Sequence, residues 1–360
     1  MLSDLLRRFD RVELAPAPGI NLLVGGNGAG KTSVLEALHL MAYGRSFRGR
    51  VRDGLVALGA EALEIYIEWK QRGADLGPVR RKAGLRHGGQ GWTGRLDGSP
   101  VENLGDLCAA LAVVTFEPGS HVLVSGSREP RRRQLDWGLF HVEQAFLAEW
   151  RRYARALKQR NALLKARGGT SQLSAWDREL AEAGDAMTQY RQAYVERLEP
   201  HFQSLVSKLL PEAGTAGLRF DPGWRREDLS LEDALLLARE RDLAAGYTSV
   251  GPHRADWQID YGKLQGRDQL SRGQAKLTAL AFLLGQASAH AAATGEWPVV
   301  CLDDLGSELD REHLGYVLTF LNGTPAQVFI TGTEMPPAMA ELELPAQSFS
   351  VDEGHVEPMT

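Results

Sequence analysis

The hydrophobic pattern near both ends of the chain is typical of a sheet. Residues 63–69 alternate between apolar and polar positions, which predicts a half-buried antiparallel strand. Asp97-Gly98 is a favoured pair for a hairpin turn, and Glu353-Gly354 predicts a second hairpin. Further segments have the length and composition of strands: residues 20–24, 113–116, 257–261, 298–302 and 327–331.

The middle of the chain has a different pattern. Between about residues 128 and 243 strand signals are absent, and long stretches rich in Ala, Leu, Arg and Glu predict helices. Gly168-Gly169-Thr170 is expected to break the first helix, and Pro200 and Pro211 the next. Ser230 begins a capping-box pattern that predicts another helix start. We therefore expect a helical insertion that is too short and too interrupted for a long coiled coil.

This organisation predicts three segments along the chain. Residues 1–118 and 245–360 would form the first and second parts of one α/β lobe, and residues 119–244 would form a helical arm lobe. A length of 360 residues is sufficient for two domains, or for one large domain with an insertion.

The composition is that of an ordinary globular protein, with 43% hydrophobic and 24% charged residues. No apolar run reaches transmembrane length, and residues 1–10 are charged where a signal peptide needs an apolar core. Cys108 and Cys301 lack metal-ligand spacing, and Cys301 is expected to be a buried free thiol. We therefore expect a cytoplasmic protein.

Residues 25–32 match the phosphate-binding pattern G-x-x-x-x-G-K-[ST] without a mismatch. They follow the predicted strand at 20–24 and precede residues 33–43, whose apolar positions have the spacing of one helix face. The glycines would let the backbone wrap a polyphosphate, and amides at the helix start would point at its oxygens. A chance match in a glycine-rich turn is the alternative, against which the flanking elements argue. The residues expected to bind the nucleotide are Gly25, Gly26, Asn27, Gly28, Ala29, Gly30, Lys31, Thr32 and Ser33.

Two acidic residues at a strand end would complete this site. Lys31 is expected to reach the β- and γ-phosphates and Thr32 to hold Mg²⁺, which also needs a carboxylate. The apolar strand at 298–302 ends in Asp303 and Asp304. Asp303 would contact Mg²⁺ directly or through water, and Asp304 would orient or deprotonate the attacking water. A strand that ends in a polar turn would explain one of these residues but not both.

The segment Ser271-Arg272-Gly273-Gln274 precedes a predicted helix and forms a second candidate anion site. It resembles the signature motif of ABC-type ATPases, with Arg272 where many members have a second glycine. Residues 307–310 resemble their D-loop. In that superfamily the signature motif of one subunit caps the γ-phosphate held by the other. The resemblance therefore implies that Ser271, Gly273 and Gln274 bind ATP held by a partner subunit, with Ser271 acting in catalysis.

The whole chain resembles the RecF family of bacterial recombination mediators. The resemblance implies an α/β, ABC-type ATPase head, in which a P-loop sheet and an antiparallel β subdomain carry an inserted helical second lobe. It also implies ATP and Mg²⁺ as ligands, an ATP-dependent homodimer, DNA binding, and slow ATP hydrolysis that releases the dimer. The matching blocks occur in family order at residues 25–32, 35–37, 44–48, 116–118, 131–136, 241–243, 246–248, 251–256, 271–274, 302–310 and 331–333.

The same resemblance implies partners and shows two departures. Family members act with RecO and RecR and help RecA to load at single-strand gaps and stalled forks, so double-stranded, gapped or junction DNA is the implied substrate. Residues 117–121 lack both the acidic residues expected after Pro118 and a Q-loop glutamine. Thr331 and Thr333 occupy the place of the usual switch histidine. Both departures concern hydrolysis rather than binding.

The net charge of −5 does not by itself indicate a nucleic-acid partner, but basic residues cluster locally. Arg131, Arg132 and Arg133 are dense, and we expect them to contact DNA phosphates. Arg45 and Arg48 follow the first helix and could contact phosphate or DNA, or pair with surface carboxylates. The basic run from residue 151 to residue 167 is equally typical of a solvated helix face.

Two other functions remain open from the sequence. A transporter's nucleotide-binding subunit would place the signature motif much sooner after the phosphate loop, and the predicted helical arm argues against that class. A structural clamp that binds ATP without hydrolysing it is the second alternative. Asp304 keeps it open, because it is one methylene shorter than the glutamate common at this position and would reach the attacking water less well.

Overall fold

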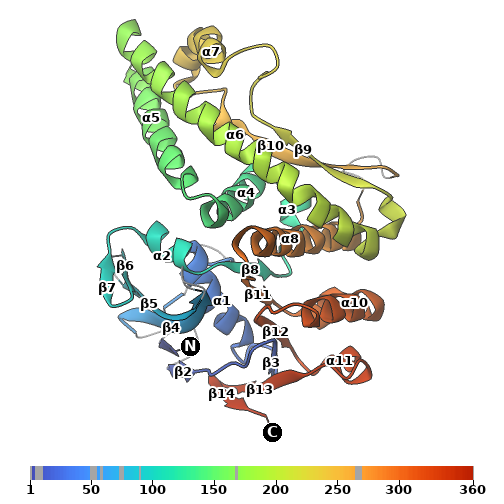
Figure 1. The fold of residues 1–360 in the computed structure, drawn as a ribbon. Helices are drawn as coiled ribbons and strands as arrows, with labels where there is room; N and C mark the ends of the chain where they lie inside the picture. The colour runs from blue at the N-terminus through green and yellow to red at the C-terminus, as the bar shows by residue number, and fades with distance from the viewer. Residues whose placement is uncertain are drawn as a thin grey trace. The chain divides into compact units, whose positions relative to one another are not determined.

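The computed structural model describes residues 2–4, 11–48, 55–56, 60–72, 77–88, 91–166, 169–263 and 270–359. The chain divides into two compact units (Figure 1). The first unit comprises Met1–Ser120 and His290–Thr360, and the second comprises His121–Ala289. No helix in the described part of the chain is long and apolar enough to cross a membrane.

A largely parallel sheet carries the phosphate loop of the first unit. Its strand order within the described residues is β14-β13-β3-β12-β11-β8, and only β14 runs antiparallel to its neighbour. Strands β3, β11 and β12 are short and almost wholly apolar, as expected of strands buried on both faces. The strand bounds are β3 Ile20–Val24, β8 Val113–Phe116, β11 Val299–Leu302, β12 Val328–Gly332, β13 Ala346–Asp352 and β14 His355–Pro358.

A second, antiparallel sheet in the same unit has the order β2-β1-β4-β5-β6-β7. The turn at Asp97-Gly98 joins β6 to β7 with both residues at positive φ, 50° and 88°, which confirms the predicted hairpin. The strand bounds are β1 Leu2–Asp4, β2 Arg11–Glu13, β4 Ala62–Arg72, β5 Pro78–Gly88, β6 Gly91–Leu96 and β7 Ser99–Val101.

Helix α1 (Lys31–Tyr43) lies in the core of the first unit. Leu35 and Leu40 are fully buried, and they share one apolar cluster with Leu63 of the antiparallel sheet and Cys301 of the parallel sheet. Cys301 is a buried free thiol, as the sequence predicted, and burial raises its pKa. The remaining helices of this unit in the described residues are α2 Leu104–Ala110, α9 Leu305–Glu308, α10 Arg311–Asn322 and α11 Pro337–Glu341.

The second unit is mainly helical, with one small sheet. The Ser230 hydroxyl accepts a hydrogen bond from the Asp233 amide at the start of α7, which confirms the predicted cap. Strands β9 (Ala216–Asp221) and β10 (Asp256–Tyr261) pair antiparallel. The helices are α3 Val122–Ser125, α4 Arg128–Val142, α5 Phe146–Ala166, α6 Thr170–Leu209, α7 Leu231–Ala245 and the start of α8 (Arg272–Thr294), with short 3₁₀ turns at Pro211–Ala213 and Pro252–Arg254.

Buried arginine–aspartate pairs fasten the second unit. Arg160 bonds Asp177 at 2.6 Å and Asp242 at 2.7 Å, and all three side chains are at most 4% exposed. Arg191 of α6 contacts both carboxylate oxygens of Asp136 on α4, at 2.8 and 2.9 Å. A buried charge is costly unless it is paired, so these contacts fix how the helices of this unit pack.

The structure corrects three predictions about this region. Pro200 does not interrupt a helix, because it lies inside α6, which is 40 residues long. A proline inside a helix costs about 3 kcal/mol, and burial of Leu198 and Phe202 on either side supplies compensating packing. Strand β9 lies where no strand was predicted. Residues 245–289 belong to the second unit rather than to the nucleotide-binding lobe, because β10 pairs with β9.

Candidate nucleotide-binding site

The phosphate loop connects β3 to α1 and depends on its glycines. Gly28 and Gly30 have φ of 81° and 117°, which side-chain-bearing residues rarely adopt. A Cβ on Gly25 would lie 2.0 Å from the carbonyl oxygen of Val351. The Gly354 amide donates to the Ala29 carbonyl at 3.3 Å, so the hairpin between β13 and β14 holds the other end of the loop.

Lys31 lies at the first position of α1, folded over this loop. Its ammonium group donates to the carbonyls of Gly25 at 2.7 Å and Gly26 at 2.8 Å, and the residue is 9% exposed. Burial lowers the pKa of Lys31, while the nearby carboxylates of Asp304 and Asp303 act against that shift. The Lys31 ammonium group is therefore held beside the loop by two hydrogen bonds that bonds to phosphate oxygens could replace.

Asp303 joins the loop to the acidic strand end. The hydroxyls of Thr32 and Thr331 both donate to its Oδ1, at 2.9 Å and 2.7 Å. The residue is 5% exposed, and burial raises the pKa of Asp303, whereas the two hydroxyl hydrogen bonds and the charge of Arg48 oppose the rise. The structure thus brings together Thr32 and Asp303, the two predicted magnesium ligands.

These oxygens suit Mg²⁺, which takes oxygen ligands and keeps several waters and substrate phosphate oxygens in its shell. In the described part of the chain, no cluster of three or more His, Cys, Asp or Glu side chains could hold a metal alone. Thr32 and Asp303 would therefore supply the protein's share of a site completed by a phosphate ligand.

Asp304 begins α9 in the left-handed conformation, with φ of 52° and ψ of 38°. Its backbone amide donates to the Thr331 hydroxyl at 2.8 Å. Among the described residues, none hydrogen-bonds its half-buried carboxylate. A strained backbone held by a buried hydroxyl, with an uncommitted carboxylate, is suited to orienting a water molecule.

Thr331 is a site residue that the sequence did not assign a role. It ends the buried part of β12, parallel to β3 on one side and β11 on the other. The carboxyl ends of these strands bring Thr331, Asp303 and the phosphate loop to the same sheet edge. The signal that could have identified Thr331 was its position at the carboxyl end of a predicted strand, at the place where related ATPases have a histidine.

Arg45 and Arg48 are exposed residues just after α1. Arg48 lies close enough to Asp303 to lower the pKa of its carboxyl. His39 of α1 is 7% exposed, and its Nδ1 lies 3.0 Å from the Thr115 hydroxyl. Burial first, and the charge of Arg45 second, lower the pKa of His39 to about 3. Both arginines therefore act electrostatically on groups of the nucleotide-binding unit.

The signature-like segment starts α8 and belongs to the second unit. Ser271 and Gln274 cap the helix reciprocally: the Gln274 amide donates to the Ser271 hydroxyl at 3.2 Å, and the Ser271 amide donates to the Gln274 side chain at 3.0 Å. Ser271 and Gly273 are exposed. The segment thus presents a capped, solvent-facing helix N-terminus of the kind that can accept an anion.

The structure contradicts the predicted DNA contact at Arg131. The residue is 2% exposed, and its guanidinium bonds both oxygens of Asp256, at 2.7 and 2.9 Å. Arg132 is half-buried and donates to the Ala255 carbonyl at 3.2 Å. Arg133 is exposed but hydrogen-bonds Glu129 one turn earlier on α4. Arg167, at the end of the later basic run, lies outside the described residues.

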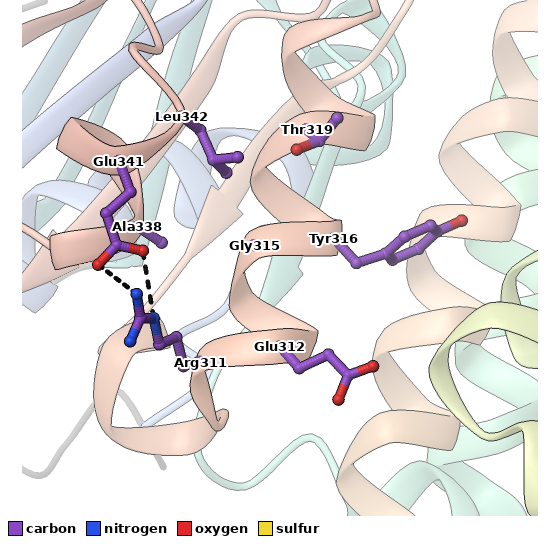
Figure 2. A pocket seen from close by; sticks show the side chains of 8 residues that line it. All are labelled: Arg311, Glu312, Gly315, Tyr316, Thr319, Ala338, Glu341 and Leu342. Carbon is purple, nitrogen blue, oxygen red and sulfur yellow. Dashed lines mark hydrogen bonds and ion pairs between the residues drawn. The ribbon is translucent and has the colours of Figure 1, made fainter.

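A shallow groove of about 510 Å³ lies elsewhere on the first unit, between α10 and α11. Figure 2 shows Arg311 and Glu341 joined by two contacts at one end of the groove. The Tyr316 side chain points away from these two residues. None of the predicted site residues lines this groove. It is therefore separate from the nucleotide site.

Comparison with known proteins agrees with this geometry. The model of the RecF/RecN/SMC N terminal domain family matches residues 4–344. The DNA replication and repair protein RecF of Stenotrophomonas maltophilia (strain R551-3) is 66% identical over 337 residues, covering 94% of this chain and 93% of that protein.

Solved structures agree as well. The recombination mediator protein RecF-ATP of the RecFOR pathway matches with a TM-score of 0.86 and 27% identity, covering 100% of this chain and 96% of that one. An Smc head domain from Pyrococcus furiosus, with a TM-score of 0.59, 15% identity and coverage of 99% and 94%, shares the fold. The ABC-type head fold predicted from the sequence is confirmed, and the chain belongs to the RecF family of DNA replication and repair proteins.

Proposed function

We propose that this chain is an ATP-dependent DNA-binding protein of recombinational repair and replication-fork maintenance, with ATP held between two copies of the chain. The observation that carries the proposal is the cluster at the sheet edge, where Thr32 and Thr331 both bond Asp303 beside the phosphate loop. Structures of a RecF protein with ATP support the nucleotide. The names of the relatives support a role in DNA replication and repair.

In this proposal each residue of the loop has a defined task. The amides of Gly25, Ala29 and Ser33 are bonded to backbone carbonyls, and the other amides of residues 25–33 would surround the phosphates. Lys31 would exchange its two carbonyl partners for β- and γ-phosphate oxygens. Thr32 and Asp303 hold Mg²⁺, which would offset phosphate charge. Asp304 orients the attacking water. Its short side chain, together with Thr331 in place of a histidine, leads us to propose slow hydrolysis that releases the dimer.

The helix start at Ser271 supplies the second half of the composite site. Ser271 and Gly273 are exposed, and the amides of Ser271 and Gln274 are held only by their reciprocal capping bonds. A phosphate held by another copy would accept from the Gly273 amide and replace these capping bonds. Arg45 and Arg48 lie on the nucleotide-binding unit and would contribute positive charge there. Under this arrangement ATP is an essential part of the dimer interface, and dimerisation depends on both motifs.

The proposed partners follow from the family. The solved RecF structure belongs to the RecFOR pathway, which supports RecO and RecR as partners. We propose that this chain helps RecA to load at single-strand gaps with these proteins. Its DNA would be double-stranded, gapped or junction DNA, held mainly through the phosphate backbone.

The test is light scattering of the purified protein with and without Mg²⁺-ATP, comparing wild type with Lys31→Ala and Ser271→Ala. We expect ATP to convert the wild type from monomer to dimer and neither variant to respond. Lys31→Ala should lose ATP binding, whereas Ser271→Ala should keep it, because each copy's own loop remains intact. A wild type that binds ATP and stays monomeric would contradict the composite site.

Phosphate release and DNA binding, measured on the same purified protein, distinguish the two alternative functions from the proposed one. A clamp that does not hydrolyse ATP would dimerise and never release phosphate, whereas the proposed enzyme releases it slowly and an Asp304→Asn variant stays dimeric for longer. A transporter's nucleotide-binding subunit would require a membrane partner and would have no affinity for DNA. DNA binding by the purified protein would therefore exclude it.

A further inference from the structure

The antiparallel sheet of the first unit has one buried face and one solvent face. Along β4, the side chains of Leu63, Ile65 and Ile67 are each at most 4% exposed. Their partners Ala83 and Leu85 on β5 are 3% and 2% exposed. Because successive side chains of a strand alternate between faces, this burial fixes the register and turns the even-numbered residues towards solvent.

Basic side chains gather on the solvent face. Lys70 of β4 lies directly opposite Arg80 of β5. Two more cations extend this pair along the strands, Arg72 beyond Lys70 and Lys82 beyond Arg80. On the next strand, Arg95 lies opposite a glycine of β5. We call this surface the cationic sheet face; it consists of the exposed residues Lys70, Arg72, Arg80, Lys82 and Arg95.

Nearby carboxylates balance part of this charge. Glu68 lies directly opposite Lys82, and Asp97 accepts a hydrogen bond from the Lys82 backbone amide. Glu68 pairs with Arg80, whose side chain remains 77% exposed. Glu64 pairs with Arg86 farther along the sheet at 2.9 Å, with both side chains 58% exposed. Within the described residues, the side chains of Lys70, Arg72 and Arg95 form no ion pair, although the Glu296 carboxylate accepts a hydrogen bond from the Arg72 backbone amide.

The like charges on this face destabilise the sheet, so a contribution to stability does not explain why they are there. Like charges directly opposite each other on adjacent strands destabilise a sheet, and Lys70 and Arg80 are such a pair. Same-face neighbours along a strand are about 6.6 Å apart, so the cations form a ladder of point charges. A polyanion with regularly spaced charges would relieve the repulsion and release its counterions.

We infer that the cationic sheet face binds the phosphate backbone of DNA without sequence preference. The inference rests on the proposed DNA-binding function and names a surface for it, since Arg131 is committed to Asp256. Phosphate contacts require exposed cations and no base readout, which is what this face offers.

The experiment measures duplex DNA affinity by fluorescence anisotropy at several salt concentrations. The test variant is Lys70→Gln/Arg72→Gln. The matched control is Arg311→Gln/Arg219→Gln, which removes the same charge from side chains that are 77% and 62% exposed but paired with carboxylates. A third variant, Arg95→Gln, tests the face from another strand. ATP binding and thermal midpoint are measured on each protein.

We expect the slope of log affinity against log salt to become shallower by about 2 in the double variant and about 1 in Arg95→Gln. The control slope should stay at the wild-type value. The thermal midpoint of the double variant should not fall, because a repulsive pair has been removed. These results together would support the inference.

Two results would overturn it. If the wild type binds DNA and both test variants keep its slope, the cationic sheet face is not the contact surface, and the proposed function stands without it. If the wild type has no affinity for duplex DNA while it binds ATP and dimerises, the DNA-binding function fails and the inference falls with it.

Discussion

Thr331 donates a hydrogen bond to Asp303 at 2.7 Å, from a position that is 1% exposed. The same hydroxyl accepts from the Asp304 amide at 2.8 Å. One buried oxygen therefore orients the proposed magnesium ligand and holds the next residue in its left-handed conformation. This makes Thr331 a positioning residue for both acids.

Thr331→Val should separate binding from turnover. It keeps the shape and removes the hydroxyl, so we expect ATP binding close to wild type and a kcat lower by roughly ten- to a hundredfold. Leaving the Asp304 amide unpaired should also cost about 1–3 kcal/mol of stability. Thr331→Ser is the control, because it restores the hydroxyl and should recover most of the kcat. Equal kcat in Thr331→Val and wild type would contradict the assignment.

Gly25→Ala should disrupt the phosphate loop. Its Cβ would lie 2.0 Å from the Val351 carbonyl, so either the loop or β13 must move, at a cost of about 1–3 kcal/mol or more. Gly26→Ala is the matched stability control, because a Cβ there meets nothing within 4 Å. Thermal unfolding of the two variants measures the difference. An equal fall in both midpoints would count against close packing of the loop on β13.

Arg131→Ala should destabilise the second unit without changing the salt dependence of DNA binding. The change leaves the fully buried Asp256 without its bidentate partner, and breaking such a pair costs about 3–5 kcal/mol. Arg133→Ala removes an exposed charge from the same helix and should cost less than about 1 kcal/mol. Urea denaturation of both variants tests this order. A shallower salt slope in Arg131→Ala would restore it as a DNA contact.

Acid should weaken the first unit through His39. Its pKa is lowered to about 3 by burial, whereas the unfolded chain titrates near 6.5, so the unfolded state binds more protons between these values. The contribution of neutral His39 to the free energy of unfolding is fully present above about pH 6.5. It decreases as the pH falls, by about 2 kcal/mol at pH 5. His39→Gln should flatten this part of the stability curve. An unchanged curve in that variant would show that other groups dominate.

The sequence predicted the parts of the site that depend on neighbouring residues. The phosphate loop, its strand and its helix lie within 25 consecutive positions, so their pattern was visible without the fold. Asp303 and Asp304 were identifiable because they end an apolar strand. Thr331 was not, since its role comes from lying beside Asp303 across two parallel strands rather than from any local pattern.

Long-range pairing also explains the errors. Arg131 was expected to be free because its carboxylate partner, Asp256, lies 125 positions away. Strand β9 is short and begins with Ala216 and Gly217, and its pairing with β10 rather than its composition makes it a strand. Pro200 was expected to end a helix, yet packing on both sides overrode its local preference.

The close approach of Gly25 to Val351 has a consequence for how the protein is made. The phosphate loop is synthesised long before the backbone that it packs against, at Val351 and Gly354. Contacts this distant in sequence form slowly, because a long chain must be ordered first. During translation the loop is therefore exposed without its support, and the nascent chain should acquire nucleotide affinity only after the β13–β14 hairpin has left the ribosome.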